Sequence, residues 1–143
     1  DFYANCWRSP LLFPNAVTLL QKLRTDGYRL GIITNGSVRS QRSKLEHGKL
    51  LSLVDVALIS EEEGVRKPDA LIFQRAARHL DLAPTECVMV GDNPLADIGG
   101  ALAVDMKAIW RRGYLPWPDA MTRQPSHVIN TIGELVEIDW QDL

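Results

Sequence analysis

The sequence predicts one α/β domain in which a parallel sheet carries helices on both faces. Short apolar runs of strand length alternate along the chain with amphipathic segments of helix length, which is typical of parallel α/β folds. The 143 residues suffice for one domain with a hydrophobic core. Their composition, 45% hydrophobic and 24% charged, is that of an ordinary globular protein rather than a disordered chain.

The first elements follow from the spacing of apolar residues. Apolar side chains between Ala16 and Leu23 recur at i, i+3, i+4 and i+7, which predicts an amphipathic helix. The turn signal "DGY" follows it, and the apolar run "RLGIIT" at 29–34 predicts the first strand. After the break "NGS", we expect a polar helix at 38–47 and a second strand at 54–60.

A charged loop, "EEEGVRKPDA", is expected between that strand and the next helix. Pro68 fixes its own φ and biases Lys67 away from helical conformations, so the helix should begin near Asp69. The remaining expected elements are strands at 87–90 and 106–110, a helix at 94–103, an edge strand at 127–129 and a helical turn within 131–138.

Several classes of protein are disfavoured by charge and hydropathy. The net charge of -2 and the lack of a basic cluster argue against a general nucleic-acid binder. No apolar run approaches the roughly 18 residues of a membrane helix, and no signal peptide is visible. Two cysteines, Cys6 and Cys87, do not make a disulfide framework. We therefore expect a cytoplasmic protein that binds neither nucleic acid nor membrane.

Polar residues follow three of the predicted strands at their carboxyl ends, where ligands bind in parallel α/β sheets. Thr34 ends the first strand, and Lys67 lies in the loop after the second. Asp92 and Asp97 follow the third strand in "VGDNPLAD". The fold should bring these four side chains to one crevice. Each has a simpler explanation alone: a helix cap for Thr34, a solvated charge for Lys67, a turn or helix-start residue for each aspartate.

Together these residues predict a phosphate and metal site. The two carboxylates suit Mg²⁺, which prefers oxygen ligands. Mg²⁺, the lysine and the hydroxyl would share the negative charge of a phosphoryl group. The backbone N–H groups of "NGS", which opens a helix, would add an anion site, and Gly36 would let the backbone turn sharply there.

Two residue pairs outside this set also carry expectations. Gly99 and Gly100 lie inside a predicted helix, where glycine is costly, so we expect close contact between that helix and the sheet. Arg111 and Arg112 follow the fourth predicted strand, and one expectation is that they border the site and touch a phosphate or an acidic substrate. The simpler expectation for both arginines is a solvated loop.

These segments resemble the haloacid dehalogenase-like hydrolases. "GIITNGS" is similar to the family's second motif, a strand ending in Thr or Ser. "VRKPD" is similar to the third motif, built around a lysine, and "VMVGDNPLAD" to the fourth in its GDxxxxD form. The resemblance covers 13–138 and extends to small-molecule phosphatases with a helical cap inserted after the first strand. It implies a Rossmann-like core for 14–143, with 1–13 as a remnant of the connection from cap to core.

The resemblance also implies roles for single residues. Thr34 and Lys67 would be catalytic, Thr34 by binding the transferring phosphoryl group and Lys67 by pairing with the nucleophile and the phosphate. Asp92 would ligate Mg²⁺ directly and Asp97 directly or through water, with Asn93 in support. The implied phosphate-binding set is Thr34, Asn35, Gly36 and Lys67.

The family's first motif, DxDx[TV], does not occur in these 143 residues. In the family it ends the first, central strand, and its first Asp is the nucleophile that forms a phosphoaspartyl intermediate. We therefore expect the C-terminal part of a phosphatase, lacking the first strand and most of the cap, and inactive alone. Loss of a central strand exposes unpaired backbone edges. A complementing N-terminal segment or a second copy should cover them, or the fold should rearrange.

Three functional hypotheses remain at this point. The leading one is a Mg²⁺-dependent phosphatase acting on a small phosphorylated metabolite. The second is a 2-haloacid dehalogenase, which the family also includes and which releases halide without Mg²⁺. The third is a catalytically dead module that binds phosphate or metal. The two carboxylates at metal-binding spacing favour the phosphatase over the dehalogenase.

Overall fold

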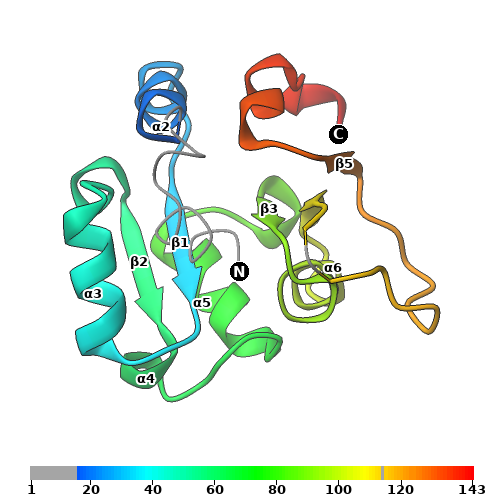
Figure 1. Cartoon of the computed structure of the whole chain (residues 1–143), viewed down its shortest axis with the longest axis horizontal. Helices are drawn as coiled ribbons and strands as arrows, with labels where there is room; N and C mark the ends of the chain where they lie inside the picture. The colour runs from blue at the N-terminus through cyan, green and yellow to red at the C-terminus, as the bar shows by residue number, and fades with distance from the viewer. Residues whose placement is uncertain (1–15, 114) are drawn as a thin grey trace.

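The computed structural model describes residues 16–113 and 115–143, and Figure 1 shows its strands in two parallel sheets. One sheet pairs β1 (Gly31–Thr34) with β2 (Val56–Ile59). The other has the order β3 (Val88–Gly91), β4 (Lys107–Arg111), β5 (His127–Ile129). The α-helices are α2 (Ala16–Thr25), α3 (Val38–His47), α4 (Ser60–Glu63), α5 (Ala70–His79) and α6 (Gly100–Ala103). The predicted parallel α/β class is confirmed.

In the described part of the chain, no strand pairs with both sheets. There β1 pairs only with β2, and β3 pairs only with β4. Their other edges therefore form no ladder with any described strand. A Rossmann-like sheet would be continuous if one further parallel strand paired with both edges.

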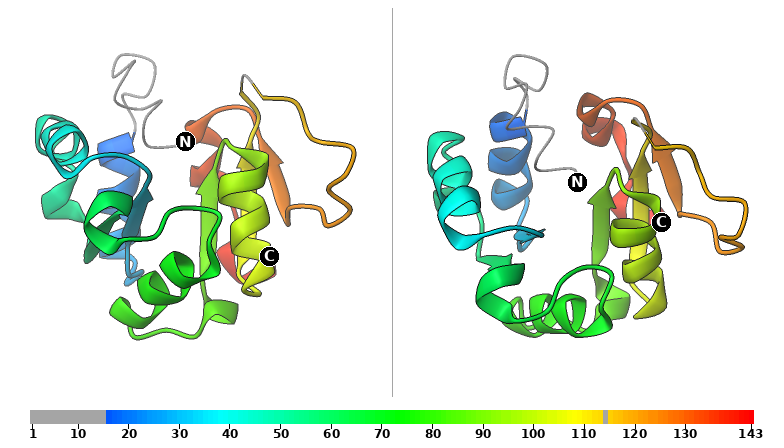
Figure 2. Two further views of the ribbon diagram at one scale, coloured as in Figure 1. Left: turned by 90° about the horizontal axis from the view of Figure 1, so that it is seen from below. Right: turned by 60° about the horizontal axis from the view of Figure 1, so that its bottom comes forward.

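Helices, rather than a shared strand, hold the two sheets together. The α5 side chains Ile72 and Phe73 are fully buried in a cluster with Leu58 of β2 and Ala108 of β4. Figure 2 shows α5, in green, below the strands of both sheets. Because one helix packs against both sheets, their carboxyl ends are brought toward one site.

A second cluster covers the opposite face of the larger sheet. Leu19 and Leu23 of α2 pack there with Ile109 of β4, Ile129 of β5 and Leu135. Leu135 belongs to η4 (Ile132–Glu137), a 3₁₀ helix where the sequence predicted a helical turn. Helices therefore cover both faces of the sheet, as expected.

Two local predictions about helices are wrong. The charged segment after β2 begins with the short helix α4, which the sequence analysis assigned to a loop. Gly64 ends α4 with φ of 73° and a backbone hydrogen bond to Ser60. The predicted helix at 94–103 is divided into η3 (Pro94–Gly99), a π-helical turn, followed by α6.

The glycine pair in that segment does not contact the sheet as predicted. A Cβ on Gly100 would collide with the ring of Phe73 and approach Pro68 Cα at 3.2 Å. A Cβ on Gly99 would approach Met121 Cε at 3.2 Å. The close contact is therefore between α6 and α5, and this lets two short helices pack beneath the site.

Cys87 is the cysteine that the structure describes, and it is a free, half-buried thiol. Burial raises the pKa of the Cys87 thiol, and the neighbouring Glu86 carboxylate raises it further. Cys6 and the predicted connection at 1–13 lie outside the described residues. Within the described ranges, no helix is both long and apolar enough to cross a bilayer.

Candidate functional site

A buried ion pair joins the loops that follow β2 and β3. Lys67 Nζ lies 2.6 Å from Asp97 Oδ1, and both side chains are at most 2% exposed. Two opposite charges buried this deeply need close geometry and further hydrogen bonds to offset their lost hydration. The structure thus brings together two residues that the sequence placed 30 positions apart.

The π-helical turn η3 directs Asp97 back toward the strand it follows. Asn93 caps the turn by accepting N–H groups from Leu95 and Ala96. The Asn93 backbone N–H in turn donates to Asp97 Oδ2 at 3.1 Å. Gly91 makes room, because a Cβ there would lie 2.5 Å from the Asp97 Cβ. Both Asp97 oxygens therefore accept hydrogen bonds from this chain, one from Lys67 and one from Asn93.

Asp92 directly follows β3 and is 8% exposed. Its carboxylate lies 3.4 Å from Arg111 Nη2, and its backbone oxygen accepts the Trp110 indole N–H at 3.1 Å. Arg111 is 7% exposed, so the prediction of a solvated loop is wrong for this residue. It is the last residue of β4, and the parallel register places it beside the segment that follows Gly91.

Asn35 directly follows Thr34, a fully buried residue at the end of β1. The Asn35 carboxamide makes two hydrogen bonds with the main chain of Lys67. Its Oδ1 accepts the Lys67 N–H at 2.9 Å, and its Nδ2 donates to the Lys67 carbonyl at 3.1 Å. Asn35 was predicted to bind phosphate, and the structure shows its side chain engaged with the lysine loop.

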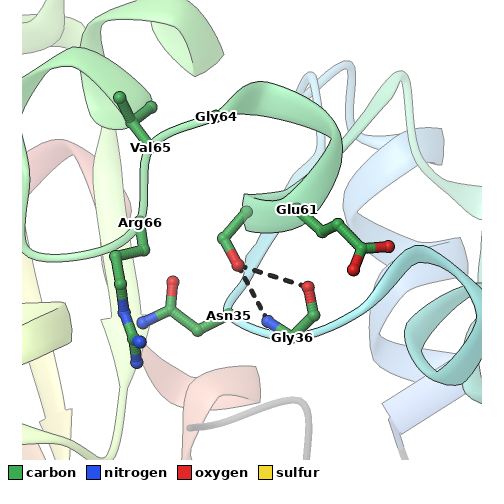
Figure 3. Close-up of a pocket in the computed structure, with 7 residues that line it drawn as sticks. Asn35, Gly36, Glu61, Gly64, Val65 and Arg66 are labelled. Atoms are coloured by element: carbon green, nitrogen blue, oxygen red, sulfur yellow. Dashed lines mark hydrogen bonds between the residues drawn. The ribbon is translucent and has the colours of Figure 1, made fainter.

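The backbone around Gly36 is already hydrogen-bonded to the segment that follows β2. Figure 3 shows the Ser60 hydroxyl bridging Gly36, where it accepts the Gly36 N–H at 2.9 Å. Glu61 Oε1 accepts the Val38 N–H at 3.0 Å, at the start of α3. The expectation that the N–H groups of "NGS" stand free for an anion is therefore wrong for Gly36. Gly36 does turn sharply, with φ of 150°.

A pocket of about 430 Å³ opens between these two loops. Figure 3 shows Arg66 and the Asn35 carboxamide on one side of it, and Glu61 pointing away toward α3. The full lining is Asn35, Gly36, Ser60, Glu61, Gly64, Val65 and Arg66. The pocket lies at the carboxyl ends of β1 and β2, as expected for a ligand site in a parallel sheet.

The carboxylates of the site meet the ligand requirements of Mg²⁺ to different degrees. No group of three His, Cys, Asp or Glu residues that could hold a metal occurs within residues 16–113 and 115–143. Mg²⁺ commonly binds through one or two carboxylates and takes its other ligands from water and substrate phosphate. Asp92 fits that requirement as a carboxylate at a strand end. Asp97 fits less well, because both its oxygens already accept hydrogen bonds.

Sequence reasoning missed two contributors to this site, Ser60 and Glu61, and favoured a solvated loop for a third, Arg111. Ser60 was expected to end the second strand and Glu61 to begin the charged loop, although the Ser in "ISEEE" is a typical helix-start residue. Their contacts with Gly36 and Val38 join segments far apart in the sequence, and no local sequence pattern predicts such contacts.

The fold and the charged cluster define a Rossmann-like α/β protein with a polar site at the carboxyl edge of its strands. The model of the haloacid dehalogenase-like hydrolase family matches residues 2–105. That span is more than half of the chain, and the chain belongs to this family.

Curated relatives are named as phosphatases. The phosphoserine phosphatase of Thermus thermophilus is 39% identical over 116 residues, 80% of this chain and 46% of the relative. The glyceraldehyde 3-phosphate phosphatase of Pyrococcus furiosus is 34% identical over 127 residues, 87% of this chain and 53% of the relative. The chain thus spans about half the length of these relatives.

Solved structures agree with the assignment. The HAD phosphatase of Thermococcus onnurineus has a TM-score of 0.78 at 32% identity, covering 96% of this chain and 63% of that one. The 2-haloacid dehalogenase of Pseudomonas syringae pv. Tomato has a TM-score of 0.71 at 32% identity, covering 87% and 51%. The shared fold therefore extends over nearly all of the chain.

Proposed function

We propose that this chain is part of a Mg²⁺-dependent phosphatase that acts on a small phosphorylated metabolite. The observation that carries the proposal is the buried Lys67–Asp97 pair at the carboxyl edge, with Asp92 on the adjoining strand end. Relatives named as phosphatases over most of this chain's length support the same reaction class. A cytoplasmic location, and no binding to nucleic acid or membrane, remain predictions.

Each residue of the cluster has a role in this proposal. Lys67 carries the positive charge that binds the transferring phosphoryl group, and Thr34 supplies a hydroxyl beside it. Asp97 holds Lys67 in place through the 2.6 Å ion pair. Asp92 would hold Mg²⁺, which when bound neutralises negative charge on the phosphoryl oxygens. Gly36 and Asn35 shape the loop between Thr34 and α3.

The nucleophile is the part of the site that this sequence does not contain. We propose that the first aspartate of a DxDx[TV] segment outside these 143 residues attacks phosphorus and forms a phosphoaspartyl intermediate. The P–O bond to the substrate's alcohol breaks, the alcohol oxygen takes a proton from the second aspartate of the motif, and water then hydrolyses the intermediate. Within residues 16–113 and 115–143, β1 and β3 each have an edge that pairs with no strand, which supports a strand between them as the carrier of this motif. That strand would come from a complementing N-terminal segment or from a second copy. The 143-residue chain alone would then be inactive.

The first experiment measures phosphate release with Mg²⁺ across a panel of sugar phosphates, nucleotides and phosphoamino acids. The enzyme is the product of the complete reading frame that encodes these residues. Lys67→Ala and Asp92→Asn should each lower turnover by about 10²-fold or more, because each removes charge stabilisation from the transition state. Turnover near that of the wild type in either variant would contradict the proposal.

Dehalogenase activity is the second candidate, supported by the fold shared with a 2-haloacid dehalogenase at 32% identity. Halide release from 2-haloacids in the presence of EDTA would favour it over the phosphatase. If the complete product binds Mg²⁺ and releases neither phosphate nor halide, the dead binding module is the correct reading.

A further inference from the structure

We propose that Asn35 is a positioning residue for Lys67: its carboxamide fixes the lysine main chain so that Nζ meets Asp97 and the phosphoryl group. This inference rests on the proposed phosphatase function. It begins from the pair of bonds already described, Lys67 N–H to Oδ1 at 2.9 Å and Nδ2 to the Lys67 carbonyl at 3.1 Å. The role differs from the phosphate-binding role that the sequence predicted.

Two hydrogen bonds from one carboxamide fix the Lys67 main chain more completely than a single hydrogen bond would. A carboxamide that accepts from the N–H and donates to the carbonyl of one residue restricts that residue's position and its rotation about the chain. The pairing resembles one rung of a β-ladder, made by a side chain instead of a strand. Because Asn35 directly follows Thr34, the pairing also sets the spacing between the Thr34 and Lys67 main chains.

The backbone of Asn35 is anchored by Gln41. Gln41 Nε2 donates to the Asn35 backbone oxygen at 3.1 Å, and Gln41 is only 6% exposed. Gly36 permits this approach, because a Cβ at that position would collide with the Gln41 side chain. The Asn35 carboxamide is therefore presented to Lys67 from an anchored backbone.

A chain of hydrogen bonds then crosses from one sheet to the other. It runs from Asn35 after β1 to the Lys67 main chain, from Lys67 Nζ to Asp97, and from Asp97 to the Asn93 N–H after β3. A displacement of about 1 Å at a catalytic group can lower a rate by about 10²-fold. Loss of the first link should therefore reduce turnover without removing any charge from the site.

An ion pair between the elements that follow β1 and β2 provides a matched control. Arg42 Nη2 of α3 lies 3.0 Å from Glu62 Oε2 of α4, and both side chains are exposed and lie outside the pocket lining. We expect Asn35→Ala to lower kcat by about 10- to 100-fold with KM changed less than about threefold. Arg42→Gln should lower kcat less than about threefold, although it also removes a contact between these elements.

A double-mutant cycle separates positioning from general loosening of the structure. If Asn35 acts through Lys67, Asn35→Ala should cost little more once Lys67→Ala is present, so the two effects should not add. Full additivity of the two losses in kcat would overturn the proposal. So would an Arg42→Gln variant as impaired as Asn35→Ala.

Amide hydrogen exchange of Lys67, followed by NMR, keeps the test independent of turnover. Asn35→Ala should speed exchange at Lys67 by 10-fold or more, and Arg42→Gln should leave it unchanged. Asn35→Asp keeps the acceptor but loses the donor, so it should retain protection of the Lys67 amide and still lose kcat. If the wild type releases no phosphate, the proposed function fails. The exchange data alone then test whether Asn35 positions the Lys67 main chain. Equal exchange in wild type and Asn35→Ala would overturn it.

Discussion

The two buried ion pairs at the carboxyl edge differ in closeness and in hydrogen bonding. Lys67 and Asp97 lie 2.6 Å apart, and the second Asp97 oxygen accepts a backbone N–H. Arg111 and Asp92 lie 3.4 Å apart, beyond the 2.7–2.9 Å typical of a strong charge-assisted hydrogen bond. Both pairs are nearly excluded from solvent.

Because of this difference, the Lys67–Asp97 pair suits a fixed support for Lys67. The Arg111–Asp92 pair is an exchangeable contact, in which Asp92 can take another cation. A short pair with a further hydrogen bond resists separation, so Lys67–Asp97 suits a residue that must be presented in one place. A longer pair loses less when one partner turns to another cation. Asp92 is therefore the carboxylate better suited to accept Mg²⁺, and Asp97 the one better suited to hold Lys67.

The largest expected effect is on the fixed pair. Lys67→Ala leaves the Asp97 charge buried without its ammonium partner, which typically costs about 3–5 kcal/mol in the free energy of unfolding. Urea denaturation measures this loss. The double variant Lys67→Met with Asp97→Leu removes both charges and should recover most of the stability. A loss below about 1 kcal/mol for Lys67→Ala would show that the pair does not act as a support.

The position of Asp97 is tested next through Gly91. Gly91→Ala places a methyl group 2.5 Å from the Asp97 Cβ and should cost about 1–3 kcal/mol by overpacking. Gly133→Ala is the matched control, because its nearest atom there is Thr131 Oγ1 at 3.8 Å, an ordinary contact. Thermal unfolding of both variants compares them. Equal melting temperatures would mean that Asp97 moves aside freely.

A change in the Arg111–Asp92 pair should alter the affinity for Mg²⁺. Arg111→Gln removes a positive charge beside Asp92, and two like unit charges about 4 Å apart repel by about 4 kcal/mol at an effective dielectric near 20. Mg²⁺ should therefore bind more tightly, by about tenfold or more, as measured by calorimetry. Arg112→Gln, at the exposed neighbouring residue, is the control. Weaker binding in Arg111→Gln would show that Arg111 orients Asp92 for the metal instead of competing with it.

The smallest effect concerns an exposed carboxylate that, like Asp97, accepts backbone N–H groups. Hydrogen bonds from Thr131 and Asn130 lower the pKa of Glu134 below its ordinary value of 4.5. A depressed pKa in the folded state stabilises the protein above the unfolded pKa, and this contribution is lost as pH falls through the folded pKa. Glu134→Gln should therefore be less stable at neutral pH, with the difference shrinking in acid.

Urea unfolding of Glu134→Gln at several pH values tests this expectation. Glu137→Gln serves as its control, since Glu137 is exposed in the same 3₁₀ helix. A stability difference that stays constant from neutral to acid pH would contradict the assigned hydrogen bonds.

Much of the fold was accessible from the sequence because it depends on local patterns. Apolar runs and turn residues predicted the five strands of the described residues to within about two residues, and α3 matches its predicted range. Asp69 caps α5 through the Leu71 N–H, next to the predicted start. Placement at strand ends also predicted that Lys67 would approach the segment holding Asp97.

Other features depend on contacts that no local pattern encodes. The sequence determined the α/β class, the order of the elements and the set of charged residues at the strand ends, since these follow from periodicity and strand polarity. Only the tertiary structure decided that Asp97 forms an ion pair with Lys67 and that Arg111 is buried beside Asp92. It also decided that the Asn35 carboxamide hydrogen-bonds to the Lys67 main chain. Which partner a buried charge takes depends on distances of a few tenths of an ångström between distant segments, and those distances are set by packing.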